Sequence, residues 1–348
     1  MSTLDVLLRN VSAEDINAYV RGLTTPADYF LTNTVFRERK INGVKFKTER
    51  SKRRVNAAKF RAYGTPTVLA KRQAERVINE GMLPPVGQTL EMDELAIILQ
   101  NAARGQDEQD FVDKLYDDLD RHFESVKTAM EIANGQMLAT GVVDLPGVGL
   151  DVNWQVPSAN RPTAAVMWDQ PTATPLSDEM AWLRYLKSIG APRPEMVVTS
   201  ERAIAVLASN LEYRAAFYNT PSGSTPSTTL SPADVNAVRA RWSLPPVFAY
   251  DAQVWNDDKY MRTTPEGLWA MIPPNRSEWA ETQYGVTAEQ YELAGEENPG
   301  IVAQQEPGIF VTMEKKSNPV SFSTTANAVA MPVMYTPDIH IAATVLGA

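Results

Sequence analysis

The sequence predicts an α+β protein organised around one long helix. An apolar stripe of helical period runs through residues 106–140, a span without proline. Segments with the turn chemistry of β-hairpins flank this helix on both sides. Helices with clear N-caps then alternate with short apolar strands, which is typical of a separate α/β body. Together these three observations indicate an α+β chain with a long strut helix.

Composition excludes several classes of protein. The 348 residues are enough for two or three domains of about 150 residues each. There is no cysteine, which excludes a disulfide framework, a thiolate metal site and a cysteine nucleophile. Only His122 and His340 are present, so a histidine-rich metal or catalytic centre is not expected, and His340 is predicted to be a structural residue on the polar face of a strand. The N-terminus shows no basic segment followed by an apolar one, so no secretion signal is expected.

Residues 1–33 are predicted to form an arm. Ser12 is a good N-cap, and a helix is expected over 13–21, ending at Gly22. Thr24 to Pro26 then interrupt the pattern. The arm is too small to have a core of its own, so we expect it to pack on another part of the protein.

A strongly basic window follows the arm. Residues 37–61 contain eleven basic and two acidic side chains, a net charge of +9, so the rest of this −9 chain carries −18. Strand-forming residues around Asn42 and Gly43 predict a β-hairpin turn, with return strands near 65–69 and 74–78. Such a two-stranded ribbon is marginal by itself and needs a partner surface. The basic residues are Arg37, Arg39, Lys40, Lys45, Lys47, Arg50, Lys52, Arg53, Arg54, Lys59 and Arg61.

Three hypotheses explain the basic window. It could be a solvated loop, or a nucleic-acid-binding ribbon, although aromatic residues for stacking on bases are sparse in it. A protein–protein arm is favoured, because the first half of the long helix offers a complementary acidic surface. A metal site at Asp118 and Asp120 is disfavoured against a solvated face, since adjacent helical positions diverge. The acidic residues are Asp107, Glu108, Asp110, Asp113, Asp117, Asp118, Asp120 and Glu124.

The chain after the long helix divides into three parts. Residues 142–154 predict a hairpin around Pro146 to Gly149, where no phosphate-loop motif is present. Residues 155–305 predict an α/β body with helices starting at Ser177, Ser200 and Ser231 and strands near 196–199, 247–250 and 268–272. No catalytic motif surrounds candidates such as Arg202 or Asp251. Residues 306–348 return to β-structure, and the last strand is expected to pair inside a sheet.

This order of elements resembles the major capsid proteins of tailed phages, and most closely the lambda-like major capsid protein E family. Three segments carry the resemblance: the helix end at 134–141 that leads into 142–154, the segment 194–201 before a helix, and the tail 327–346. The tail contains Ala330 to Met334 and then Pro337 and Asp338 before a last strand. The similarity covers nearly the full chain.

The resemblance implies the Hong Kong-type phage capsid fold. In that fold the long helix would be the spine of a peripheral P-domain, and the α/β body would be an axial A-domain. The implied parts are the N-arm at 1–33, the extended E-loop at 34–92, the P-domain spine helix and hairpin at 93–154, the A-domain at 155–305 and the P-domain C-terminal strands at 306–348.

The resemblance also implies a function in assembly. The chain would be a major capsid protein that forms hexamers and pentamers and then an icosahedral shell around packaged double-stranded DNA, in virions assembled in the host cytoplasm. No enzymatic activity, cofactor, metal or membrane partner is implied. Implied partners are other copies of the chain, a scaffold, a portal, decoration proteins and the packaged DNA, without sequence specificity.

Some family members cross-link an E-loop lysine to a P-domain asparagine, for which Lys45 or Lys59 and Asn318 or Asn327 could be considered. Lambda-like members usually lack this reaction, and no acidic catalyst is evident in the sequence, so it is not expected here. Two alternatives to a phage capsid are a nucleic-acid-binding protein that uses the basic window and an encapsulin-like cargo shell. A soluble enzyme ranks third, because catalytic motifs are missing.

Overall fold

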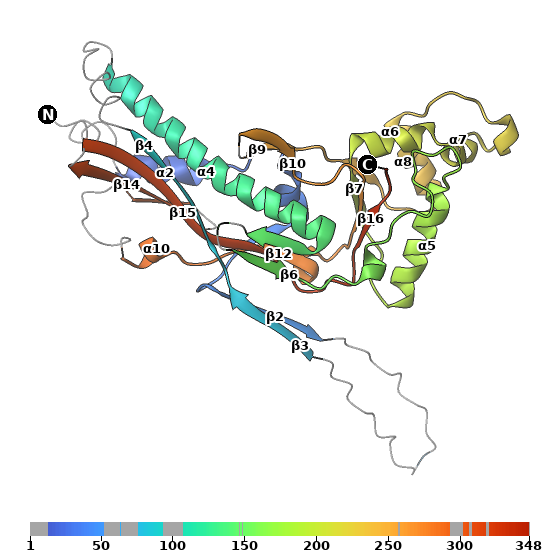
Figure 1. Cartoon of the computed structure of the whole chain (residues 1–348), viewed down its shortest axis with the longest axis horizontal. Coiled ribbons are helices and arrows are strands. Elements are labelled where there is room, and N and C mark those ends of the chain that lie inside the picture. The colour runs from blue at the N-terminus through green and yellow to red at the C-terminus, as the bar shows by residue number, and fades with distance from the viewer. Residues whose placement is uncertain are drawn as a thin grey trace.

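The structure is a computed structural model. It describes residues 13–51, 63, 76–92, 107–145, 147, 149–256, 258–292, 302–305, 308–317 and 320–347. Figure 1 shows an elongated molecule in which a long helix lies along a sheet at one end and an α/β body forms the other end. In these ranges no helix is both long enough and apolar enough to cross a membrane.

The predicted strut helix is present as α4, Asp107–Thr140, which spans about 50 Å at about 1.5 Å per residue. Its apolar stripe is buried, with Leu119, Phe123 and Val126 in one cluster with residues of the sheet beneath it. Gly141 follows in the left-handed conformation, φ 71°, as expected for a helix C-terminus. The period of the sequence therefore places one face of α4 on the sheet (Figure 1).

The sheet under α4 has six strands from distant parts of the chain. β15, Val320–Met334, is its centre and pairs antiparallel with β12, β14 and β4 along different parts of its length. β1 adds parallel to β12, and β13 adds antiparallel to β14. The bounds are β1 Arg37–Lys40, β4 Pro85–Met92, β12 Ala280–Tyr284, β13 Val302–Gln305 and β14 Ile309–Ser317.

The N-terminal arm packs on this layer, as expected for a segment without its own core. Helix α2, Ala13–Gly22, contacts β13, and Val20 is buried in the same cluster as the stripe of α4. A π-helical turn, η1 at Leu31–Val35, then leads into β1.

The predicted hairpin turn at Asn42 and Gly43 is wrong. β1 ends at Lys40 in the six-stranded sheet, whereas β2, Lys45–Ser51, pairs with β3, Arg76–Met82. The backbone of β1 is paired with β12 on one side, and the N–H of Ile41 donates to Tyr284 O at 2.7 Å. The turn therefore joins two sheets, and β2 with β3 forms a two-stranded ribbon that leaves the body (Figure 1). The predicted return strand at 65–69 lies outside the described residues.

The α/β body contains a four-stranded sheet in the order β16, β11, β7, β8. Trp168, Trp269 and Val197 are buried in the core between this sheet and its helices. The strands are β7 Met196–Thr199, β8 Val247–Ala249, β11 Leu268–Ile272 and β16 Ile341–Thr344; the helices are α5 Pro175–Ser188, α6 Glu201–Ser209, α7 Leu211–Tyr218 and α8 Pro232–Arg241.

Of the three caps predicted in the α/β body, two are confirmed; the predicted cap at Ser12 lies outside the described residues. Ser200 Oγ accepts from the N–H of Ala203 at 3.1 Å, and Ser231 forms a full capping box with Asp234. The cap at Ser177 is wrong, because α5 starts two residues earlier at Pro175, a residue favoured in the first turn. Glu179 therefore lies in the second turn of α5, and its side chain is fully buried.

Two strands pair across the domain boundaries expected from the sequence. β12 lies within 155–305 but pairs with β1 and β15, and β16 lies within 306–348 but pairs with β11 of the α/β body. Both strands are apolar or buried on both faces, so their sequences do not show which sheet they join. The remaining elements are β5 Val142–Leu145 and β6 Leu150–Asn153, which form the predicted hairpin, η2 Ser158–Asn160, η3 Ser222–Ser224, β9 Gln253–Asn256, β10 Lys259–Arg262, α9 Arg276–Trp279 and α10 Ala288–Glu292.

Candidate assembly surface

A buried carboxylate joins the arm, the spine helix and the α/β body. Glu131 of α4 accepts from the backbone N–H groups of Leu31 and Thr32 at 3.1 and 2.8 Å, and from Thr32 Oγ1 at 2.6 Å. The hydroxyl of Tyr250, just after β8, also donates to it. Burial raises the pKa of Glu131, and the hydrogen bonds act against that shift. This network sets where the arm leaves α4 and where the α/β body meets it.

A buried lysine of α4 holds β1 in place. Lys127 forms an ion pair with Glu38, and Tyr284 Oη donates to the same Glu38 oxygen at 3.0 Å. The ammonium also lies 5.3 Å from the ring centroid of Phe123 and 5.1 Å from that of Tyr284. Burial lowers the pKa of Lys127, and the Glu38 carboxylate opposes that shift. Within one chain, this ion pair therefore joins an acidic residue of the basic window to a basic residue of the helix, which is the reverse of the predicted polarity.

The structure describes five of the predicted basic residues with their side chains. Arg37, Lys45 and Lys47 are exposed, and Lys40 is half-buried. Arg39 is exposed but pairs with Glu281 of its own chain at 3.2 Å. Arg50 lies on β2, and its side chain is outside the described part. Also outside it are Lys52, Arg53, Arg54, Lys59 and Arg61.

The acidic face of α4 is partly described. Asp117, Asp120 and Glu124 are exposed, and Asp118 is half-buried with a pKa that burial raises. Tyr19 Oη of the arm donates to Asp120 Oδ1 at 2.8 Å, and burial together with Asp120 raises the pKa of Tyr19 to about 12. Among the described residues no cluster of three metal-ligating side chains occurs. For Asp107, Glu108, Asp110 and Asp113 the structure places the backbone in α4 and nothing more.

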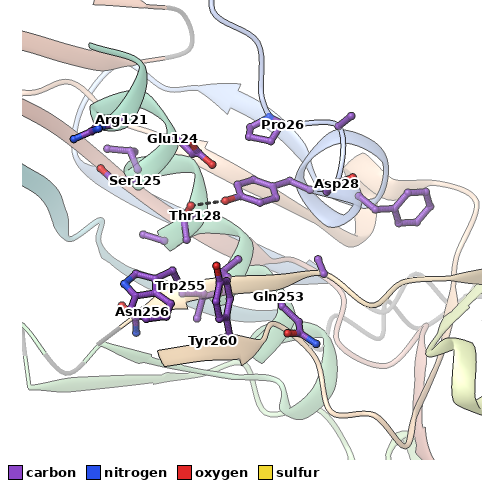
Figure 2. A pocket seen from close by; sticks show the side chains of 18 of the residues that line it. Pro26, Asp28, Arg121, Glu124, Ser125, Thr128, Gln253, Trp255, Asn256 and Tyr260 are labelled. Atoms are coloured by element: carbon purple, nitrogen blue, oxygen red, sulfur yellow. Dashed lines mark hydrogen bonds between the residues drawn. The ribbon is translucent and has the colours of Figure 1, made fainter. Parts of the chain in front are cut away.

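A groove of about 1260 Å³ opens beside the described part of this acidic face. Its walls are the turn of the arm at 26–30, one side of α4 at 121–132, part of β4, and the β9–β10 hairpin with the strand end before it. Figure 2 shows Arg121, Glu124 and Thr128 of α4 on one side and Trp255 and Tyr260 of the hairpin on the other. The hydroxyls of Tyr29 and Thr128 are 2.5 Å apart and join the arm to the helix at one end.

Sequence reasoning missed the β9–β10 hairpin that forms this wall. Trp255 and Tyr260 face each other across it as a register pair, with ring centroids 4.9 Å apart in an edge arrangement. The sequence signal for it is the group of turn-forming residues from Asn256 to Asp258, which separates two short segments that contain β-forming aromatic residues. Its large aromatic residues are exposed, so the usual assignment of apolar side chains to a buried face does not identify this hairpin.

The structure places only some of the residues considered for cross-linking. Asn327 lies on β15 opposite Gly87, and its Nδ2 donates to Glu289 Oε1 at 2.8 Å. The sequence alone indicated no acidic neighbour, because 38 residues separate the two side chains. Lys45 lies at the start of β2, and Asn318 and Lys59 are outside the described residues.

His340 is buried immediately before β16 and not on a polar strand face as predicted. Its Nδ1 accepts from Trp279 Nε1 at 3.2 Å, and burial lowers its pKa from 6.5 to about 3. The unfolded chain therefore binds more protons than the native one between pH 6.5 and about 3, so stability falls as the pH falls through this window. We expect His340→Gln to reduce the loss of unfolding free energy between pH 7 and pH 4 by about 3 kcal/mol. Urea unfolding at both pH values tests this, and an unchanged pH dependence would contradict it.

The fold is that of phage capsid subunits. The capsid protein of a prophage from Escherichia coli CFT073 superposes with a TM-score of 0.59 at 11% identity, over 98% of this chain and 96% of that one. A phage-related protein from Bordetella bronchiseptica RB50 gives a TM-score of 0.53 at 12% identity, over 94% and 95%. No individually curated protein matches the sequence significantly.

The family is shown by the sequence itself. The family model described as phage major capsid protein E matches residues 12–345. The chain therefore belongs to the phage major capsid protein E family, whose members are structural proteins of the virion shell. The predicted α+β class, the capsid fold and the resemblance are confirmed, and the encapsulin-like alternative has less support.

Proposed function

We propose that this chain joins its neighbours in the shell by laying its β2–β3 ribbon over the acidic face of α4 in the next subunit. The shell is the icosahedral head built from hexamers and pentamers around packaged DNA. The ribbon is the observation that supports this contact: in the described residues β2 and β3 pair only with each other. A two-stranded ribbon needs further contacts to be stable, and a neighbouring subunit can supply them.

Contacts within one chain favour this arrangement. In the described residues, the ribbon packs on its own body at its base, where the rings of Phe46 and Trp154 lie 5.5 Å apart. Glu38 and Asp120 already have partners in their own chain, while Lys47 and Glu124 are exposed on the two surfaces proposed to meet. A head-to-tail contact of two different patches closes into rings, and each subunit held by several neighbours needs only weak individual contacts.

The parts of the capsid fold are assigned as proposals. The N-arm is 1–33, and strand pairing favours 45–82 as the projecting part of the E-loop, narrower than 34–92. The P-domain comprises α4, the β5–β6 hairpin and the six-stranded sheet, and the A-domain comprises the α/β body with β16. A scaffold, a portal, decoration proteins and assembly in the host cytoplasm belong to the same proposal.

Charge reversal tests the ribbon contact. We expect the variant carrying Arg50→Glu, Lys52→Glu, Arg53→Glu and Arg54→Glu to lose shell formation at least about tenfold, because attraction becomes repulsion at each site. The matched variant with glutamine at the same four positions should form shells at a yield between that of the glutamate variant and that of the unchanged protein. Rising salt should destabilise the shells formed by the unchanged protein, because it screens exposed charges. Particle counts by negative-stain electron microscopy give the yield; equal yield and salt tolerance in all three proteins would refute the contact.

A further inference from the structure

The turn at Asn42 and Gly43 carries a reactive chemistry besides its place between two sheets. The sequence contains two Asn-Gly dipeptides, at 42–43 and at 134–135. In this dipeptide the main-chain nitrogen of the glycine can attack the side-chain amide of the asparagine, because glycine has no side chain to hinder the approach. The two dipeptides lie in opposite surroundings, so the structure distinguishes the one that can react from the one that cannot.

Asn42 has the freedom that this reaction needs. Its side chain is exposed, and it lies outside the helices and strands, between β1 and β2. Gly43 has φ 131°, a conformation that residues with a side chain rarely adopt, and nothing lies within 4 Å of a Cβ built there. The N–H of Gly43 donates to Ile41 O at 3.1 Å, two residues back, which is the bent contact of a γ-turn. The reacting groups are therefore open to solvent and outside any strand ladder.

Asn134 is held in place by the folded chain. Its side chain is fully buried in α4, where Nδ2 donates to Thr32 Oγ1 at 3.1 Å and Oδ1 accepts from Thr282 Oγ1 at 3.0 Å. The nitrogen of Gly135 belongs to the same helix. A ring can close at this dipeptide only after α4 opens locally, which is costly for a buried helix. Asn134 is therefore an internal reference with the same local chemistry as Asn42.

From this contrast we propose that Asn42 is a site of spontaneous deamidation. When the N–H of Gly43 loses its proton to solvent base, the nitrogen attacks Asn42 Cγ. The new Cγ–N bond closes a succinimide ring, the Cγ–Nδ2 bond breaks, and the leaving nitrogen takes up a proton from solvent and departs as ammonia. Water then opens the ring. Attack at Cγ leaves an aspartate, whereas attack at the main-chain carbonyl carbon leaves an isoaspartate, whose main chain is longer by one carbon.

Both products change the junction between the six-stranded sheet and the ribbon. Each places a new carboxylate in the basic window. The isoaspartate also lengthens the main chain between two hydrogen bonds of the junction: the N–H of Ile41 donates to Tyr284 O at 2.7 Å, and the N–H of Val286 donates to Gly43 O at 3.2 Å. These bonds fix where the ribbon leaves the body, so isoaspartate at position 42 loosens its base as the protein ages. The reaction takes place within one chain and does not depend on the proposed contact between subunits.

Peptide mass spectrometry of unassembled subunits, aged at mildly alkaline pH, tests the site. We expect the peptide that contains Asn42 to gain the mass of an amide-to-acid conversion, and the peptide that contains Asn134 to convert at least about tenfold more slowly. In urea the two rates should become similar, because the local chemistry is the same. The variant Asn42→Gln should stay unconverted, since its ring closes less readily. Similar rates at both positions in the folded protein, or faster conversion at Asn134, would overturn the inference.

Hydrogen exchange tests the effect on the junction. The matched variant Asn42→Asp carries the same new charge on a main chain of ordinary length. We expect the N–H of Val286 to exchange at least about threefold faster in aged protein, in which an isoaspartate methyltransferase detects the modification, than in fresh protein or in Asn42→Asp. Conversion to aspartate alone, or unchanged exchange at Val286 in protein that contains isoaspartate, would refute the loosening of the ribbon base.

Discussion

Replacing Arg239 with alanine is expected to lower the free energy of unfolding by about 3–5 kcal/mol, because it leaves a buried carboxylate without its counter-ion. Arg239 Nη1 and Nη2 lie 2.6 and 2.9 Å from the two Glu179 oxygens, and both side chains are fully buried. Nε also donates to Pro245 O at 2.8 Å, and the guanidinium lies 5.0 Å from the ring centroid of Trp269. Urea unfolding of unassembled subunits, followed by tryptophan fluorescence, measures the loss.

Two further variants distinguish the contribution of the buried ion pair to stability from that of an exposed ion pair. Arg202→Ala removes an exposed pair with Glu266, 2.6 Å apart, and should cost less than about 1 kcal/mol. The double variant Glu179→Leu, Arg239→Met should lose less stability than Arg239→Ala, since no unpaired charge stays buried. If Arg239→Ala lowered the free energy of unfolding no more than Arg202→Ala, the buried ion pair of the α/β core would be contradicted.

The second large effect is expected from a single methyl group added at Gly135, in the last two turns of α4. A Cβ there would lie 2.0 Å from the carbonyl oxygen of Thr263, which is part of the backbone. Helix propensity alone predicts that Gly135→Ala stabilises the protein by about 1 kcal/mol. The steric overlap acts in the opposite direction and forces the helix away from the α/β body, so we expect a net loss of about 2 kcal/mol or more.

The same substitution should also loosen the Glu131 network. Thr263 Oγ1 donates to Tyr250 Oη at 2.7 Å, and Tyr250 in turn donates to Glu131. Gly223→Ala is the matched control, because nothing lies within 4 Å of a Cβ built there. Thermal unfolding of both variants compares them directly, and a Gly135→Ala protein as stable as the control would show that α4 and the α/β body are not packed as described.

Local patterns in the sequence predicted local structure well. The stripe of α4, the Gly141 stop and the caps at Ser200 and Ser231 all depend on residues within a few positions of one another. Their physics is the physics of a single helix end or helix face. For the same reason the order of helices and strands was sufficient to indicate the family.

Long-range pairing was not predictable in the same way. A turn at Asn42 and Gly43 has the same local chemistry whether its strands pair with each other or, as here, join two sheets. β12 is buried on both faces, so no alternation shows its partners. The burial of Glu179 does not follow from its local sequence, because its partner Arg239 is 60 residues away.

The charges of the candidate site can be counted in the sequence, whereas its shape cannot be read from it. The acidic face of α4 and the basic window follow from counting residues, and the described parts of both are on the surface. The groove needs the arm, α4, β4 and the β9–β10 hairpin together, and these elements meet only in the folded chain. Lys127 and Glu38 show the same limit, because the ion pair between buried Lys127 and half-buried Glu38 reverses the polarity expected from the two segments.

Negative-stain electron microscopy of the purified protein, over a range of protein and salt concentrations, tests the central claim most directly. We expect closed shells, or rings of six and five subunits, at low salt, with fewer particles as salt screens the contact between ribbon and helix. A uniform monomer or dimer under every condition would contradict self-assembly through these surfaces.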